Sequence, residues 1–334
     1  MKNEIEQLLI DQLSVWETAR NNYEALKQVK TKELNVNGAK FKVQFNPARI
    51  VSSGAKVDAK SIQERKCFLC AENRPKEQDG IEFNPTQPPQ RGGDYRISNI
   101  FTNNEFLLQN PPFGGRGGYT ILINPFPIFP KHFTIPDVEH VPQLILGLFG
   151  DMLDLAEKMD DYVIFYNGPK CGASAPDHVH FQAGNKGFLP IEKEWRNHIS
   201  EKVNDNFYAV NYGFPAFVIE TTDKSECVQI FEKIYQNLEI KEGEDEPMMN
   251  ILAWFEGNKY VAVVIPRAKH RPDCYFAEGE KNILISPASV DLGGVFITPL
   301  EKDFEKISAE NVAEILGEVC LDKKKFQEIV ERIK

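Results

Sequence analysis

The chain has 334 residues, which is long enough for two domains or for one large duplicated domain. Its 42% hydrophobic and 26% charged residues are typical of a globular protein and exclude a fibrous or a disordered chain. With 39 basic and 49 acidic side chains the formal charge is -10, which leaves no broad basic field for a nucleic acid or an anionic membrane. A local basic pocket for a small phosphate ester is compatible with this charge.

The sequence also bears on the compartment of the protein. Residues 1–6 contain no basic region that leads into an apolar core, and no later run is long enough to cross a bilayer. The six cysteines are too few and too scattered for the disulfide framework of a secreted protein. We therefore expect a cytoplasmic protein, in which only Cys67 and Cys70 are close enough to suggest joint chemistry.

Hydrophobic spacing predicts the elements of the first part of the chain. Apolar residues step by three or four from Ile5 to Leu26, which predicts one amphipathic helix packed on a sheet. Asn37-Gly38 predicts a tight hairpin turn, and the alternation over 41–45 predicts the half-buried strand that follows it. Residues 72–118 are rich in Pro, Gly, Asn and Gln, which predicts long surface loops with short strands between them.

The rest of the chain indicates a duplication. The predicted order is strand 119–124, helix 141–159 and strand 162–166. A similar order returns after about residue 200 as strand 216–220, helix 226–238, and strands 251–255 and 260–265. This order predicts a duplicated α+β unit, although no residue-level repeat links the two halves. A long helix over 302–333 is expected to close the chain.

The stretch from 166 to 182 contains the residues with chemistry. If 178–182 is a strand, its period of two places His178, His180 and Gln182 on one face. The loop before it has two glycines together with Asn167 and Ser174, residue types that let backbone N–H groups approach a phosphate. A neutral imidazole can attack an activated phosphorus near pH 7 without another base. One histidine on a strand would indicate a structural side chain, but two histidines and a glutamine in alternation favour a functional site.

These residues resemble a known family. The pattern Asn-Gly-x-x-x-Gly-x-Ser over 167–174, followed by His-x-His-x-Gln over 178–182, is similar to the signature of the galactose-1-phosphate uridylyltransferase branch of the histidine-triad superfamily. That branch includes the diadenosine tetraphosphate phosphorylases and the GDP-sugar phosphorylases, and 178–183 resembles the last group most. Three further segments resemble family segments: the Cys-x-x-Cys of 67–70, residues 124–136, and residues 286–294.

The resemblance implies an α+β fold with two histidine-triad-like units. Residues 1–200 would form the catalytic unit and residues 201–334 a second unit without the triad, in agreement with the single histidine, His270, of the second half. His180 would be the nucleophile that takes a nucleoside monophosphate from a nucleotide sugar and leaves a sugar 1-phosphate. Gln182 and Ser174 would act beside it, and the remaining phosphate contacts are implied for Asn167, Gly168, Lys170 and Gly172.

A zinc ion is the expected cofactor. It needs about four ligands, of which Cys67 and Cys70 supply two. The resemblance implies His132 and His178 as the other two, so that His178 orients the catalytic strand and does not attack. His140 is the reserve ligand, and two buried thiols without a metal are the alternative.

Several cations could neutralise phosphate charge. Lys170 is the best candidate because it lies within the phosphate-loop signature, and the basic cluster 267–271 could reach the substrate from the second half. The other candidates are Lys131, Arg91 and Arg116.

The leading hypothesis is a nucleotidyltransferase or phosphorylase that acts on a nucleoside-diphosphate sugar, of the GDP-hexose phosphorylase or hexose-1-phosphate uridylyltransferase type. The acceptor would be phosphate or a sugar 1-phosphate, and the reaction would be ping-pong through a nucleotidyl-histidine. The alternatives are a diadenosine polyphosphate phosphorylase and a catalytically silent nucleotide-binding module. We expect no nucleic-acid or membrane partner, and a homodimer is compatible with the sequence.

Overall fold

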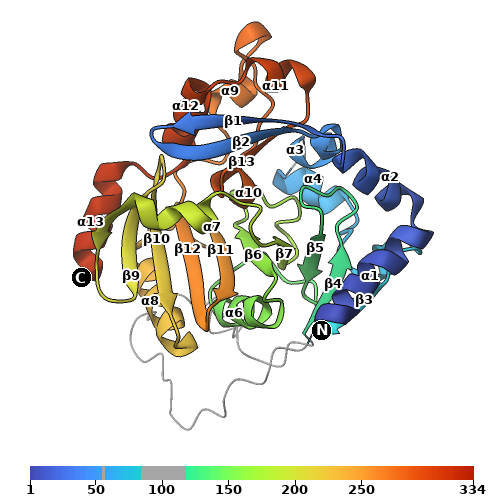
Figure 1. Cartoon of the computed structure of the whole chain (residues 1–334), viewed down its shortest axis with the longest axis horizontal. Helices are drawn as coiled ribbons and strands as arrows, with labels where there is room; N and C mark the ends of the chain where they lie inside the picture. Colours follow the sequence, from blue (N-terminus) through green and yellow to red (C-terminus); the bar gives the residue numbers. More distant parts are fainter. Residues whose placement is uncertain (55–56, 84–117) are drawn as a thin grey trace.

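A ten-stranded antiparallel sheet runs through the computed structural model, which describes residues 1–54, 57–83 and 118–334 (Figure 1). Its strand order is β3-β4-β5-β7-β6-β11-β12-β10-β9-β8. The strands are β3 (Gly80–Phe83), β4 (Tyr119–Ile123), β5 (His132–Pro136), β6 (Tyr162–Asn167), β7 (His180–Asn185), β8 (Ile199–Lys202), β9 (Phe207–Asn211), β10 (Pro215–Thr221), β11 (Met249–Glu256) and β12 (Lys259–Pro266). The predicted α+β class is confirmed. Much of the loop region predicted over 72–118, with Arg91 and Arg116, lies outside the described residues.

The two halves of the chain meet in the middle of this sheet. Strand β6 of the first half pairs antiparallel with β11 of the second, from Asn167↔Asn250 to Ile164↔Ala253. The β-hairpin β11–β12 turns at Gly257 and Asn258, where both residues have positive φ, as the sequence predicts. Because one sheet contains both halves, the boundary near residue 200 separates two parts of a continuous structure and stays a prediction.

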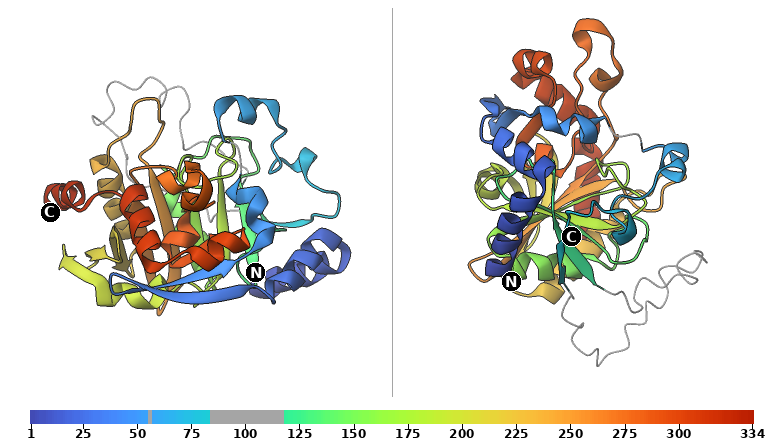
Figure 2. Two further views of the ribbon diagram at one scale, coloured as in Figure 1. Left: turned by 90° about the horizontal axis from the view of Figure 1, so that it is seen from above. Right: turned by 90° about the vertical axis from the view of Figure 1, so that its right-hand side faces the viewer.

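A small second sheet brings the start and the end of the chain together. The hairpin of β1 (Lys30–Val36) and β2 (Ala39–Phe45) turns at Asn37 and Gly38, whose φ values of 53° and 89° confirm the predicted tight turn. Strand β13 (Val295–Thr298) pairs parallel with β2. Figure 2 shows this hairpin alongside the C-terminal helices.

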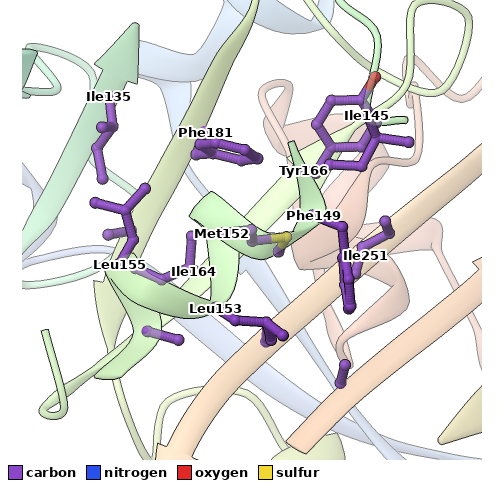
Figure 3. Packing of buried hydrophobic residues seen from close by; sticks show 14 of the residues in the cluster. Ile135, Ile145, Phe149, Met152, Leu153, Leu155, Ile164, Tyr166, Phe181 and Ile251 are labelled. Atoms are coloured by element: carbon purple, nitrogen blue, oxygen red, sulfur yellow. The ribbon is translucent and has the colours of Figure 1, made fainter. Parts of the chain in front are cut away.

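Hydrophobic cores lie on both faces of the large sheet. One core is formed with the helices α1 (Lys2–Val15), α2 (Glu17–Leu26), α6 (Phe149–Lys158), α8 (Lys224–Asn237) and α13 (Lys323–Ile333). The other is formed with the small sheet, α10 (Ser289–Leu292) and α12 (Ala309–Val319). Figure 3 shows α6 on the first face, where Phe149, Met152 and Leu153 pack near Ile164 and Ile251 of β6 and β11. Burial on both faces explains why β6 and β12 are apolar over nearly their whole length.

The remaining helices are short. They are η1 (Pro47–Arg49), α3 (Ile50–Ser53), α4 (Ala59–Glu64), η2 (Ala71–Asn73), α7 (Ile191–Glu194), η3 (Trp195–His198), α9 (Asp273–Phe276), η4 (Gly279–Lys281) and α11 (Glu301–Lys306). Over the described ranges, we find no helix long and apolar enough to span a membrane.

Three predicted helices differ in length from the structure. The opening helix is interrupted at Trp16, whose extended backbone (φ -101°, ψ 97°) separates α1 from α2, although its apolar stripe packs on the sheet as predicted. The closing helix is three helices, because Ser308 and Asp322 cap new helix starts with their side chains. The helix predicted over 141–159 begins only at Phe149, because the preceding residues run beside the loop before β7, where the Val141 carbonyl accepts a hydrogen bond from the Val179 N–H.

Candidate active site and metal centre

A cavity of about 890 Å³ opens on the face of the sheet that carries the histidine motif. It is lined by His180, Gln182, Asn167, Gly172 and Ser174, together with residues from the segments 49–78, 122–134 and 270–297. The alternation of β7 explains the placement, because Val179 and Phe181 enter the core beneath α6 while His180 and Gln182 point to the opposite face. Five of the predicted site residues thus meet in one cavity.

His180 is held as a neutral imidazole with one nitrogen occupied. Its Nδ1 lies 2.8 Å from the backbone carbonyl of His178, to which it donates, and its side chain is 3% exposed. Burial lowers the pKa of His180 to about 4. The Nε2 atom therefore keeps its lone pair at neutral pH, and the ring lines the cavity. This is the state in which an imidazole acts as a nucleophile.

Gln182 lies beside His180 and contacts a buried histidine. Its Oε1 is 3.0 Å from Nε2 of His132, and Nδ1 of His132 accepts a hydrogen bond of 3.1 Å from the Ile128 N–H. Burial, and then the nearby Arg49 guanidinium, lower the pKa of His132 to about 3. His132 is therefore a neutral hydrogen-bonding partner of Gln182.

Asn167 ends β6 and is surrounded by residues of the second half. Its Oδ1 accepts hydrogen bonds from the Ser289 N–H at 2.9 Å and from Nδ2 of Asn250 at 2.9 Å. The Oγ of Ser289 is also 2.7 Å from this oxygen. Helix α10, which starts with Ser289, contacts both β6 and β11 (Figure 1).

The two predicted glycines have different roles. Gly172 lines the cavity with φ +97°, and a Cβ there would lie 2.5 Å from Cβ of Ala288, so only glycine fits. Gly168 does not line the cavity; its N–H donates to the Met249 carbonyl at 3.2 Å. Gly168 thus ties the loop 167–174 to β11, and its predicted direct contact with phosphate has no support in the cavity lining.

Most of the predicted cations are engaged elsewhere. Lys170 forms an ion pair with Glu244 and does not line the cavity, so the structure does not bring it to the other site residues. Lys131 pairs with Glu6, and Lys269 pairs with Glu318. Arg49, Arg65 and Arg271 line the cavity. Arg271 belongs to the predicted basic cluster 267–271, whereas Arg49 and Arg65 were not predicted.

A second cluster of side chains, next to the cavity, has the composition of a metal site. The ligand atoms of Cys67, Cys70, His140 and His178 all lie within 4.8 Å of one another. Cys67 Sγ is 3.3 Å and Cys70 Sγ is 3.6 Å from Nδ1 of His178, and Cys70 Sγ is 3.1 Å from Nδ1 of His140. Two thiolates and two imidazoles are a donor set that zinc binds tetrahedrally.

The structure corrects the fourth ligand. His132 was predicted, but both of its ring nitrogens are engaged with Ile128 and Gln182, away from the two cysteines. His140, the reserve ligand, takes the fourth place. The error arose because two histidines lie eight residues apart in the same segment, and only the end of β5 at Pro136 decides which one turns toward Cys70.

The surroundings of the cluster fit a metal. Nε2 of His178 donates to the Asp137 carbonyl at 2.8 Å, which leaves Nδ1 with a lone pair toward the cysteines. Nε2 of His140 lies 3.8 Å from Asp177, a carboxylate that also pairs with Arg65. Burial raises the pKa of the Cys67 thiol, but its interaction with the His178 ring and hydrogen bonds from the backbone N–H groups of Leu69 and Cys70 outweigh burial and bring the pKa to about 6. The four residues therefore fit zinc in donor type, spacing and orientation.

Comparisons with known proteins agree with this architecture. Residues 8–87 and 112–185 match a domain of unknown function, DUF4922, and residues 190–334 match the GDPGP1-like C-terminal domain. The solved yeast Ap4A phosphorylase Apa2 in complex with Ap4A is 16% identical with a TM-score of 0.57, over 95% of this chain and 97% of that chain. The chain thus has the fold of the galactose-1-phosphate uridylyltransferase-like branch of the histidine-triad superfamily, and its C-terminal part matches a GDPGP1-like domain.

Two further structures of the yeast protein match this chain. One has a TM-score of 0.52 over 92% of this chain and 94% of that chain, and the complex with AMP has 0.52 over 92% and 96%, both at 16% identity. A search of curated proteins finds no match. At this identity the yeast structures establish the fold, with its two histidine-triad-like halves.

Sequence reasoning missed several residues that support the histidine motif. Gln143 is fully buried and accepts from the His180 N–H at 2.7 Å, while its Nε2 donates to the carbonyls of Asn167 and His180. It thus fastens β7 to β6 at the site. Asn250 was also missed, and Arg267, predicted near the substrate, lies 3% exposed behind Asn250. No local pattern marks Gln143 or Asn250, because their partners are distant in sequence.

Proposed function

We propose that the protein is a nucleotidyltransferase or nucleotide phosphorylase that works through a covalent nucleotidyl-His180. The observation that carries the proposal is the state of His180: a neutral ring, with Nδ1–H donated to the His178 carbonyl and Nε2 left with its lone pair, in a cavity lined by two amides and a glycine loop. A catalytically silent nucleotide-binding module would not need this arrangement.

The reaction would proceed in two displacements. Nε2 of His180 attacks the α-phosphorus of the donor, a P–N bond forms, and the P–O bond to the leaving phosphate ester breaks. The ring then carries a positive charge, which the hydrogen bond from Nδ1 to the His178 carbonyl stabilises. In the second displacement an acceptor phosphate oxygen attacks the phosphorus, the P–N bond breaks, and neutral His180 is restored.

The donor we favour is a nucleoside-diphosphate sugar, and the acceptor is phosphate or a sugar 1-phosphate. Support comes from the similarity of residues 178–183 to the GDP-sugar phosphorylases and from the GDPGP1-like match of residues 190–334. A diadenosine polyphosphate is the second candidate, because the yeast protein of the same fold is an Ap4A phosphorylase. The two donors share the α-phosphate chemistry, so His180 would act in the same way on both.

Zinc would be held by Cys67, Cys70, His140 and His178. When bound there, it supplies a structural cross-link between the loop of the two cysteines, the segment after β5 and the start of β7. The zinc site would also fix the start of β7, because the backbone carbonyl of His178 accepts the hydrogen bond from Nδ1 of His180. The ring of His178 would bind the metal, while its backbone carbonyl positions the nucleophile His180.

The test is to mix the purified protein with single nucleotide sugars, or with diadenosine tetraphosphate, in the absence of acceptor. Intact mass spectrometry should show one added nucleoside monophosphate, labile in acid, with a cognate donor. His180→Ala should abolish the adduct, while His198→Ala, in η3 and outside the cavity lining, should keep it. An adduct that survives His180→Ala would remove His180 as nucleophile, and no adduct with any donor would favour the silent module.

A further inference from the structure

Two side-chain amides flank the nucleophile in the cavity. Asn167 ends β6, and Gln182 follows His180 by two residues on the same face of β7. The register of the pair Phe165↔Gln182, continued by two residues, would place Asn167 opposite His180. Each amide can present either an oxygen or an NH₂ group to a substrate, and only the NH₂ group can bind a phosphate oxygen. The surrounding hydrogen bonds decide which group it is.

For Gln182 the decision starts at a backbone N–H. The Ile128 N–H can only donate, so Nδ1 of His132 must be the accepting nitrogen of that ring. His132 is fully buried, and burial and Arg49 keep the ring neutral, so Nε2 must carry the proton. This Nε2–H then donates to Gln182, which must offer its oxygen. The NH₂ group of Gln182 is left for the cavity.

Two groups that can only donate hydrogen bonds also orient the amide of Asn167. The first is the Ser289 N–H, 2.9 Å from Oδ1 of Asn167. The second is the buried Arg267 guanidinium, whose Nη1 is 2.5 Å from Oδ1 of Asn250 and thereby turns Nδ2 of Asn250 toward Asn167. Among the described residues no acceptor binds Nδ2 of Asn167, so this NH₂ group also serves the cavity.

We propose that His132 and Asn250 are positioning residues, which hold Gln182 and Asn167 with both NH₂ groups toward the oxygens of the phosphoryl group under attack. The proposal rests on the proposed nucleotidyl transfer. It gives the second half, which has no triad, a role in the site. Through Arg267 and Asn250, the second half orients the amide of Asn167 so that its NH₂ group faces the cavity. A reversed amide would place its oxygen against a phosphate oxygen and raise the barrier to attack.

The kinetic test is a double-mutant cycle on the single-turnover rate of nucleotidyl-enzyme formation. His132→Phe keeps a ring but removes the donor to Gln182, so the rate should fall about tenfold or more. In the Gln182→Ala background the same change should cost less than about threefold, because the donor it positions is already gone. Tyr23→Phe, which loses the hydrogen bonds between Tyr23 Oη and the His132 backbone but spares the ring, is the matched control. Equal losses in both backgrounds would overturn the positioning role of His132.

Asn250→Asp tests the second relay without a change of shape. An aspartate keeps the size of the side chain and the contact with Arg267, but it offers only acceptors to Asn167 and to the Cys171 carbonyl. The melting temperature should therefore fall, and the rate is compared in protein shown to be folded. The new carboxylate would accept only from the NH₂ group of Asn167, whereas the Ser289 N–H donates only to its oxygen. The amide can no longer hold its NH₂ group toward the cavity, so adduct formation should fall about tenfold or more. In the Asn167→Ala background the effect should vanish. A folded Asn250→Asp protein with the native rate would refute the second relay.

The tautomer of His132 provides a test that is independent of activity. In ¹⁵N-histidine-labelled protein, the ring of His132 should be the neutral Nε2–H tautomer, assigned by its loss in His132→Gln. An Nδ1–H tautomer would overturn the proposal even in an active enzyme, because Gln182 would then present its oxygen. Failure of native protein to form an adduct with any donor would instead refute the proposed function, whatever the tautomer.

Discussion

The third motif position influences which acceptor can attack the nucleotidyl-enzyme. An imidazole there could exchange a proton near neutral pH and assist a water molecule, whereas an amide only donates or accepts hydrogen bonds. Gln182 has its oxygen bound by His132, so it offers the bound phosphate a hydrogen bond and offers water no base. The phosphoramidate would therefore be hydrolysed slowly and react mainly with an acceptor that the cavity binds well.

Gln182→His should increase hydrolysis relative to transfer. The new imidazole can accept the His132 N–H at one nitrogen and exchange a proton with water at the other. The measurement is the ratio of nucleoside monophosphate to nucleoside diphosphate or nucleotide sugar at equal acceptor concentration, in native and variant protein. Gln182→Leu, which can do neither, should slow both reactions together. Native protein that yields mainly monophosphate with acceptor in excess would be a hydrolase, contrary to our proposal.

Residues that share a local pattern could be predicted from the sequence, and residues that act through distant partners could not. The alternation over 178–182 and the glycine loop identified His180, Gln182, Asn167 and Ser174, which all line the cavity. The choice between His132 and His140 depends on where β5 ends, and hydrophobic spacing does not determine strand ends to one residue. The contact of Lys170 with phosphate was predicted wrongly for a similar reason, because its ion-pair partner Glu244 comes from the other half of the chain.

At the scale of elements, the metal cluster joins the cysteine loop to the ends of the paired strands β5 and β7. Cys67 and Cys70 belong to a loop before η2, His140 follows β5, and His178 precedes β7. Little apolar burial holds the cysteine loop, whose small core comprises Cys67, Leu69 and Ala175 with Cys70 packed against it. A bound ion would therefore contribute a large share of the stability of this loop.

We predict about one zinc ion per chain in protein purified without added metal. Elemental analysis of His140→Ala should show little zinc and a lower melting temperature, since one of four ligands is lost. His132→Gln is the matched control, because this histidine lies outside the cluster and the variant should retain zinc. Zinc lost from His132→Gln and retained in His140→Ala would restore the ligand set expected from the sequence. Metal-free native protein with an unchanged melting temperature would exclude a structural ion.

Helix ends were the weakest part of the prediction at this scale. The apolar pattern over 302–333 continues across Ser308 and Asp322, so its periodicity indicates one helix. Both residues instead accept hydrogen bonds from the first turn of a new helix, Ser308 from the Asn311 N–H and Asp322 from the N–H groups of Lys324 and Lys325. The direction of each new helix is set by its packing on the sheet, a tertiary contact that the local pattern does not contain.

At the scale of the molecule, a buried carboxyl group helps to join the two halves. Glu246, which precedes β11, accepts a hydrogen bond of 2.9 Å from the Ile145 N–H and one of 2.5 Å from the Tyr166 hydroxyl on β6. Its side chain is 4% exposed, and its pKa is affected mainly by burial, by these two hydrogen bonds and by the nearby Asp245. Burial raises the pKa of Glu246 to about 8, even though both hydrogen bonds act to lower it.

This pKa predicts a dependence of stability on pH. Between the unfolded pKa of 4.5 and the folded pKa of about 8, the folded protein binds more protons at Glu246 than the unfolded chain does. Stability should therefore fall as pH rises through this interval, by at most about 1.4 kcal/mol per pH unit from this group. Glu246→Gln removes the titration and keeps an oxygen for the Ile145 N–H, so its unfolding free energy relative to native should be higher at pH 8.5 than at pH 5.5, by about 1–3 kcal/mol.

The measurement is denaturant unfolding of native and variant protein at both pH values, with metal content held equal. All other groups titrate in both proteins, so the difference between them isolates Glu246. Glu242→Gln, an exposed change four residues earlier in the same loop, is the control and should follow native protein at both pH values. A Glu246→Gln difference that is the same at pH 5.5 and pH 8.5 would mean that Glu246 is ionised throughout this range. The junction between the halves would then contain a buried carboxylate stabilised by its hydrogen bonds alone.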